Sequence, residues 1–168
     1  MSSYGSDWLL WAGIATLVVA ALGALAATRM SVLVAYLVVV SAATLFIAFA
    51  LGNAGTISAG LYYLPHSTFV AAALFLIADL MRRRRLQADR RHAHEPGTVL
   101  PGKTVPGLLY LLAAVAVAGL PPMAGFLAKA ALLQAVPAAH TGVVWGVVLG
   151  TSLLVIMGLV RTGIRLFW

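Results

Sequence analysis

The chain has no cysteine, and only 9% of its 168 residues are charged. The missing cysteine excludes disulfide bridges, thiolate metal sites and thiol chemistry. A soluble domain of ordinary composition is about 25% charged and about 45–50% apolar, whereas 62% of these residues are hydrophobic. The composition therefore excludes a water-soluble single-domain enzyme and predicts a membrane protein.

Long apolar stretches are what the sequence does contain. A membrane-spanning helix needs about 20 mostly apolar residues. Stretches of that kind cover residues 8–27, 30–52, 57–80, 107–136 and 142–166. The fourth is interrupted between Gly119 and Gly125, and since each half has only about 13 residues, neither half spans alone. The sequence therefore predicts an all-α, polytopic membrane bundle of five transmembrane helices, the fourth of them broken.

Acidic residues are scarce: the chain has four Asp and Glu and eleven Lys and Arg. Segment 81–106 holds seven of the basic residues and predicts a polar loop, while Arg29, Arg161 and Arg165 fall at helix ends on the same side as this loop. Because loops rich in lysine and arginine stay in the cytoplasm, we expect this loop and the C-terminus inside and the N-terminus outside. The run Arg82–Arg85 fits a topology anchor or a contact with membrane lipid, and nucleic-acid binding is not expected.

Three glycines recur every four residues in the last predicted helix: Gly142, Gly146 and Gly150. This spacing removes side-chain bulk along one stripe of a helix and lets another helix approach closely. Structural proteins and transporters both use the pattern. It therefore predicts helix packing and says nothing about chemistry.

Three ionisable side chains are candidates for a position at membrane depth, where each is costly: Asp79, His66 and Lys129. Asp79 precedes two arginines by one helical turn, which favours an ion pair at the membrane boundary over a role in transport. His66 lies near the middle of its span, next to the hydroxyls of Ser67 and Thr68. Histidine exchanges protons near neutral pH, but a histidine here fits a helix-to-helix hydrogen bond equally well.

Lys129 is the basic residue that lies away from the predicted cytoplasmic face. It follows Gly125 by four residues and the pair Pro121-Pro122 by seven. The prolines lack amide protons and free the carbonyls about four residues earlier, which is tolerated at membrane depth only where these face protein or water. Burial disfavours the charged form of an amine, so such a lysine can gain and lose a proton. The alternative is a lysine that reaches outward from a kinked helix.

Two sequence runs resemble a known family: Leu61-Tyr-Tyr-Leu-Pro-His-Ser-Thr-Phe69 and Ala118-Gly-Leu-Pro-Pro-Met-Ala-Gly-Phe-Leu-Ala-Lys129. They are similar to the D subunit of multisubunit monovalent cation/proton antiporters, which is related to the antiporter-like subunits of respiratory complex I. The resemblance implies a component of a sodium or potassium/proton antiporter in a bacterial inner membrane. It implies a transporter component that is not an enzyme, has no cofactor or metal, and works with other antiporter subunits.

The same resemblance assigns roles to individual residues. It places Lys129 at the lysine that ends one proton half-channel and His66 at the membrane histidine of the preceding helix. The hydroxyls of Ser41, Thr44, Ser67 and Thr68 are candidates to support proton transfer between the two. The family's discontinuous helix corresponds to Gly119, Pro121, Pro122 and Gly125.

The sequence departs from the family at two places where members usually carry lysines, which here are Ser31 and Ala71. The chain also resembles only the C-terminal third of such a D subunit. We therefore expect partner subunits to supply the missing helices of the ion path. The alternatives are a non-conducting assembly subunit that packs through the glycine stripe, and an antiporter-like subunit of a complex I or membrane hydrogenase.

Overall fold

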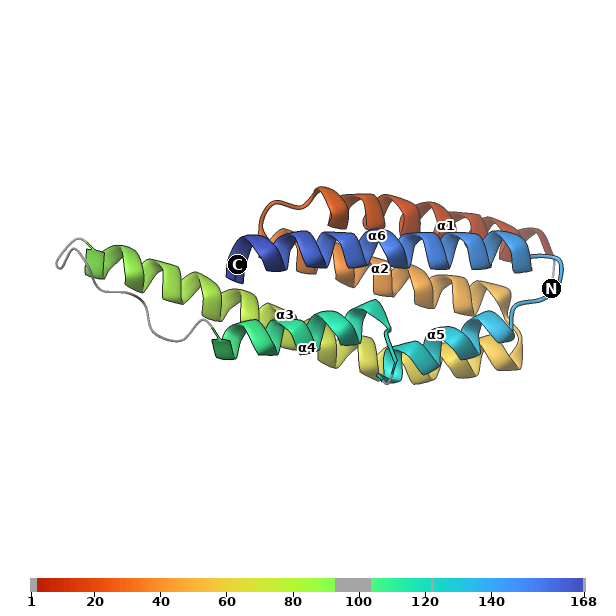
Figure 1. The fold of residues 1–168 in the computed structure, drawn as a ribbon. Helices are drawn as coiled ribbons and strands as arrows, with labels where there is room; N and C mark the ends of the chain where they lie inside the picture. Colours follow the sequence, from red (N-terminus) through yellow and green to blue (C-terminus); the bar gives the residue numbers. More distant parts are fainter. Residues whose placement is uncertain (1–2, 93–103, 122, 168) are drawn as a thin grey trace.

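The computed structural model describes residues 3–92, 104–121 and 123–167, which fold into helices joined by short connections. The helices are α1 (Ser3–Ala26), α2 (Met30–Leu51), α3 (Ala54–His92), α4 (Thr104–Ala118), α5 (Ala124–Gln134) and α6 (Thr141–Phe167). Figure 1 shows α1, α3 and α6 running in one direction and α2, α4 and α5 in the other. The helices thus form an up-and-down bundle.

Among the described residues, four stretches are long and apolar enough to cross a membrane: Asp7–Ala26, Met30–Leu51, Ala54–Arg84 and Thr141–Leu166. The two remaining helices, α4 and α5, are apolar but have only 15 and 11 residues. They follow one another in the same direction along α3 (Figure 1). The pair is the broken fourth helix that the sequence predicts, and the all-α membrane bundle is confirmed.

The third helix is longer than the sequence predicted. It continues to His92, so the loop expected over 81–106 is wrong for residues 81–92, and α4 already begins at Thr104. The reason is that arginine, leucine, glutamine and alanine all favour helix, whether or not lipid surrounds them. The end of the apolar run limits the membrane span, whereas the helix itself goes on. Residues 93–103 of the expected loop lie outside the described residues.

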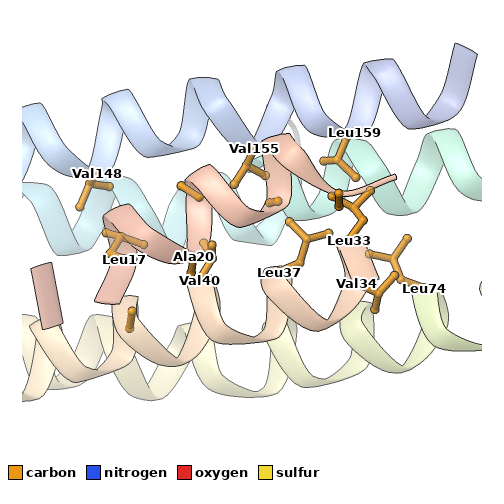
Figure 2. Close-up of a cluster of buried hydrophobic side chains, with 14 of the residues drawn as sticks. Leu17, Ala20, Leu33, Val34, Leu37, Val40, Leu74, Val148, Val155 and Leu159 are labelled. Carbon is orange, nitrogen blue, oxygen red and sulfur yellow. The ribbon is translucent and has the colours of Figure 1, made fainter. Parts of the chain in front are cut away.

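Buried small and branched side chains make up the core between α1, α2, α3 and α6 (Figure 2). The cluster includes Ala20 of α1, Leu37 and Val40 of α2, and Val155 of α6. Because alanine carries so little bulk, neighbouring helices can approach the backbone of α1 closely. The core therefore fixes α1, α2 and α6 as one packed unit.

The glycines that pack α6 differ from the predicted ones. Apart from the adjacent residues and backbone of α6 itself, no described atom lies within 4 Å of a Cβ placed at Gly142, Gly146 or Gly150. A Cβ at Gly158 would instead lie 2.8 Å from the backbone oxygen of Ala24 in α1. The predicted glycine stripe faces outward from the described part of the chain, so its packing against another helix stays a prediction.

Most of the arginines whose side chains are described lie at one end of the bundle, where α1 and α6 end and α2 begins. There Arg161 donates a hydrogen bond from Nη1 to the backbone oxygen of Leu25 at 3.3 Å. The expected ion pair of Asp79 forms with Arg83, with 2.6 Å between Oδ2 and Nε. Both of its partners are exposed, so the pair adds little stability. This end of the bundle is called the arginine end below.

At the opposite end, Asn53 joins α2, α3 and α5. Gly52 ends α2 with a φ of 66°, a left-handed conformation that glycine adopts without strain. The Asn53 side chain then caps α3, since its Oδ1 accepts a hydrogen bond from the amide of Thr56 at 2.8 Å. Its Nδ2 donates to the backbone oxygen of Ala135, just after α5, at 2.8 Å.

Replacing Asn53 with alanine is expected to lower the stability of the bundle by about 1–2 kcal/mol, because the cap and the contact with α5 are both lost. Asn53→Ser retains a capping oxygen and loses only the Nδ2 donor, so it should cost less. Thermal unfolding in detergent, followed by circular dichroism, measures both variants. Equal stability of Asn53→Ala and the unchanged chain would contradict the assignment.

Candidate functional site

The break between α4 and α5 is built by a glycine and the residues that follow it. Gly119 has a φ of +72°, and its amide bonds the backbone oxygen of Ala116 at 3.3 Å. The amide of Leu120 bonds the backbone oxygen of Val115 at the same distance. These two bonds form the Schellman arrangement that typically ends a helix at glycine. Of the two prolines that were predicted to break the helix, Pro121 is exposed at the surface of the described chain, and Pro122 lies outside the described residues.

Two carbonyls at the end of α4 receive the two predicted relay side chains. Lys129 of α5 donates a hydrogen bond from Nζ to the backbone oxygen of Ala118 at 3.3 Å. His66 of α3 places Nε2 3.2 Å from the backbone oxygen of Ala116, and since a carbonyl only accepts, Nε2 carries the proton in this contact. The last carbonyls of a helix have no partners within it and carry partial negative charge. The helix end therefore suits a positively charged side chain.

Lys129 also reaches the last helix. Its Nζ lies 3.2 Å from Oγ of Ser152 in α6 and donates to it. The side chain is half-buried and points inward, between α4 and α6. The alternative of a lysine that reaches outward from the kinked helix is therefore wrong for this structure.

Two glycines leave the space that these contacts need. A Cβ at Gly125 would lie 2.5 Å from Nε2 of His66 and 2.8 Å from the backbone oxygen of Ala116. A Cβ at Gly119 would lie 3.2 Å from Cδ of Lys129. Any larger residue at 125 would collide with both partners of the His66 hydrogen bond. The glycines of the broken helix thus make room for the histidine and the lysine.

The four hydroxyls predicted to support the relay have different surroundings. Ser67 and Thr68 both donate to the backbone oxygen of Leu64 in their own helix. Thr44 donates to the backbone oxygen of Val40, also within its own helix. None of these three hydrogen bonds reaches His66 or Lys129.

The fourth hydroxyl leads to a residue that sequence reasoning missed. Ser41 of α2 lies 3.2 Å from the hydroxyl oxygen of Tyr63 in α3. Tyr63 precedes His66 by three residues, so both lie on one face of α3, and that spacing could have drawn attention to it. Ser152, the partner of Lys129, gave no such signal, because only the packing of α6 against α5 brings it close.

Metal ligands do not gather in this region. Across residues 3–92, 104–121 and 123–167, no group of three or more histidine, aspartate or glutamate side chains could hold a metal ion. The polar groups of the site are hydroxyls, one imidazole, one amine and backbone carbonyls. These groups can accept and donate protons along hydrogen bonds.

The fold and the site together define an integral membrane protein whose broken helix places a lysine and a histidine at one helix end. Residues 1–155 match the family model described as "NADH:quinone oxidoreductase/Mrp antiporter, TM", and the chain belongs to this family. The resemblance to the D subunit of cation/proton antiporters is confirmed.

Curated relatives support the same family. The chain is 34% identical to the probable D subunit of a K(+)/H(+) antiporter from Rhizobium meliloti (strain 1021), over 99% of this chain and 36% of the relative. It is 25% identical to the D subunit of a Na(+)/H(+) antiporter from Bacillus subtilis (strain 168), over 99% of this chain and 33% of the relative. The chain thus spans about a third of the length of these two relatives.

A solved structure shares the fold. A chain of the Mrp complex from Dietzia sp. DQ12-45-1b superimposes with a TM-score of 0.73 at 24% sequence identity, over 94% of this chain and 30% of the other. At this identity the likeness establishes the arrangement of helices alone.

Proposed function

We propose that the chain is the part of a multisubunit monovalent cation/proton antiporter that contains the end of a proton half-channel. One observation supports this most directly: the ionisable side chains of His66 and Lys129 both bond carbonyls at the same helix end, inside a membrane bundle. An ionisable group at membrane depth is costly and typically serves transport. Other antiporter subunits supply the remaining helices of the ion path, and the transported cation is sodium or potassium.

The proposed mechanism moves a proton between His66 and Lys129. A proton on Nζ of Lys129 is held by the carbonyl of Ala118 and by Oγ of Ser152. When the proton leaves, the positive charge at the end of α4 disappears. This change in charge alters the electrostatic energy of ionisable groups on neighbouring helices or subunits, because charges interact strongly where water is excluded. Proton movement is thereby coupled to cation movement elsewhere in the complex.

The orientation belongs to the same proposal. The arginine end lies in the cytoplasm of a bacterium and the N-terminal end of α1 lies outside the inner membrane. The positive-inside rule supports this, since exposed Arg29, Arg82, Arg83, Arg161 and Arg165 share one end of the bundle. Anionic lipid headgroups would meet these side chains at the membrane surface.

Replacing Lys129 with alanine is expected to reduce antiport by about tenfold or more, because the terminal proton acceptor is lost. The measurement is cation-driven proton movement in inside-out membrane vesicles from cells that make this chain together with its antiporter subunits. Arg29→Ala removes one positive charge from the exposed arginine end and is the matched control. Unchanged antiport in Lys129→Ala, with normal assembly, would contradict the proposed role of the lysine.

A second candidate function is a non-conducting assembly subunit. The outward-facing glycine stripe of α6 favours it, since no described residue covers Gly142, Gly146 or Gly150. In that case the complex needs this chain to assemble, but Lys129→Ala leaves the antiport rate unchanged. The same vesicles, with the amount of assembled complex measured in parallel, separate the two functions.

A further inference from the structure

Tyr63 lies between two small spaces inside the bundle. The first is bordered by Ser41, Tyr63 and His66 and has a volume of about 10 Å³, close to the minimum that holds one water molecule. The second is bordered by Thr44, Tyr63 and Lys129 and has no room for water. The same tyrosine thus separates a space beside the histidine from a space beside the lysine.

The contacts of Tyr63 hold it in this position. Its side chain is buried, with 7% of its surface exposed, and its hydroxyl oxygen lies 3.2 Å from Oγ of Ser41. Its ring centre lies 6.3 Å from that of His66, with an angle of 48° between the planes. The buried hydroxyl can donate one hydrogen bond and accept another. It is therefore equipped to pass a proton on.

We propose that Tyr63 links His66 to Lys129, with its hydroxyl passing the proton and its ring closing the path at rest. This inference rests on the proposed antiporter function. An imidazolium at His66 gives its proton to a water in the first space, and that water gives a proton to the Tyr63 hydroxyl. The hydroxyl releases its original proton toward the amine of Lys129. His66 ends neutral and Lys129 ends as an ammonium, while the water and the tyrosine are unchanged.

The dry second space explains why the path is closed in this structure. A proton crosses a protein along hydrogen bonds between side chains and water, and a gap without either stops it. A rotation of the Tyr63 ring away from Thr44 would join the two spaces. The tyrosine is therefore a member of the relay whose movement also opens the connection between His66 and Lys129.

Tyr63→Phe tests the hydroxyl while keeping the ring and the packing. Antiport turnover is expected to fall about tenfold or more, since the relay loses its middle member, while the cation concentration at half-maximal rate stays the same. Deuterium oxide should slow Tyr63→Phe more than the unchanged protein, because proton transfer becomes the slow step. Tyr62→Phe is the matched control, since Tyr62 directly precedes Tyr63 on α3 and its side chain is 50% exposed.

The outcomes separate this inference from the function on which it rests. If Lys129→Ala abolishes antiport and Tyr63→Phe leaves turnover unchanged, the tyrosine link is wrong and the antiporter function stands. If Tyr63→Phe lowers turnover only in proportion to the amount of assembled complex, with no larger solvent isotope effect, the residue has a purely structural role and the inference is overturned. If Lys129→Ala itself has no effect, the proposed function is wrong, and the tyrosine link that rests on it is wrong as well.

Discussion

Gly125→Ala is expected to reduce antiport to near background, although it adds only one methyl group. That methyl would lie 2.5 Å from Nε2 of His66 and 2.8 Å from the backbone oxygen of Ala116. The histidine can turn away, but the carbonyl belongs to the end of α4 and moves only with the helix. Either response breaks the hydrogen bond between His66 and Ala116. Overpacking of this kind costs about 1–3 kcal/mol of stability.

The measurement for Gly125→Ala combines vesicle antiport with thermal unfolding of the purified chain in detergent. Gly142→Ala is the matched control for unfolding, because nothing in the described chain lies within 4 Å of a Cβ at that position. Alanine favours helix over glycine by up to about 1 kcal/mol, so the control should be neutral or slightly stabilising. An active and equally stable Gly125→Ala protein would show that the close approach of α3, α4 and α5 is not needed.

Gly158→Ala is expected to lower the stability of the bundle. Its Cβ would lie 2.8 Å from the backbone oxygen and 3.2 Å from the backbone carbon of Ala24 in α1. No side chain can rotate to relieve this contact, so α6 and α1 must move apart. The strain of about 2–3 kcal/mol exceeds the gain of about 1 kcal/mol in helix propensity. The net loss is about 1–2 kcal/mol.

Thermal unfolding in detergent measures this loss, and a decrease in Tm of about 2–8 °C corresponds to it for a chain of this size. Gly146→Ala, on the outward-facing stripe of the same helix, should leave the Tm unchanged or raise it slightly. The contrast between two glycines of one helix makes the test independent of general helix propensity. Equal Tm values for both variants would mean that α1 and α6 do not meet at Gly158.

Local signals in the sequence predict the helices and the break between α4 and α5. The length of each apolar run shows whether a helix can span the bilayer. Gly119 and the prolines after it end a helix through their local backbone conformation alone. His66 and Lys129 stand out because charge is costly at membrane depth. The prediction ended α3 at residue 80 because the apolar pattern ends there, whereas the helix continues beyond it.

The contacts between helices were beyond sequence reasoning. Spacing pointed to Gly142 and its two companions, whereas Gly158 lies against α1, because only the packing decides which face of α6 is covered. The hydroxyls chosen for nearness along the chain, such as Ser67, bond their own helix. Ser152 and Ser41 meet the site from other helices. Their roles depend on the positions of α6 and α2 in the bundle.

The length of α3 has a mechanical consequence. The helix contains Pro65 directly before His66 and continues to His92, so about 40 Å of helix, at 1.5 Å per residue, extends from the proline to the far end. A proline inside a helix is a common bending point. A slight bend there would swing the distant end through several ångströms. A bend at Pro65 would therefore change the position of the far end of α3 relative to His66.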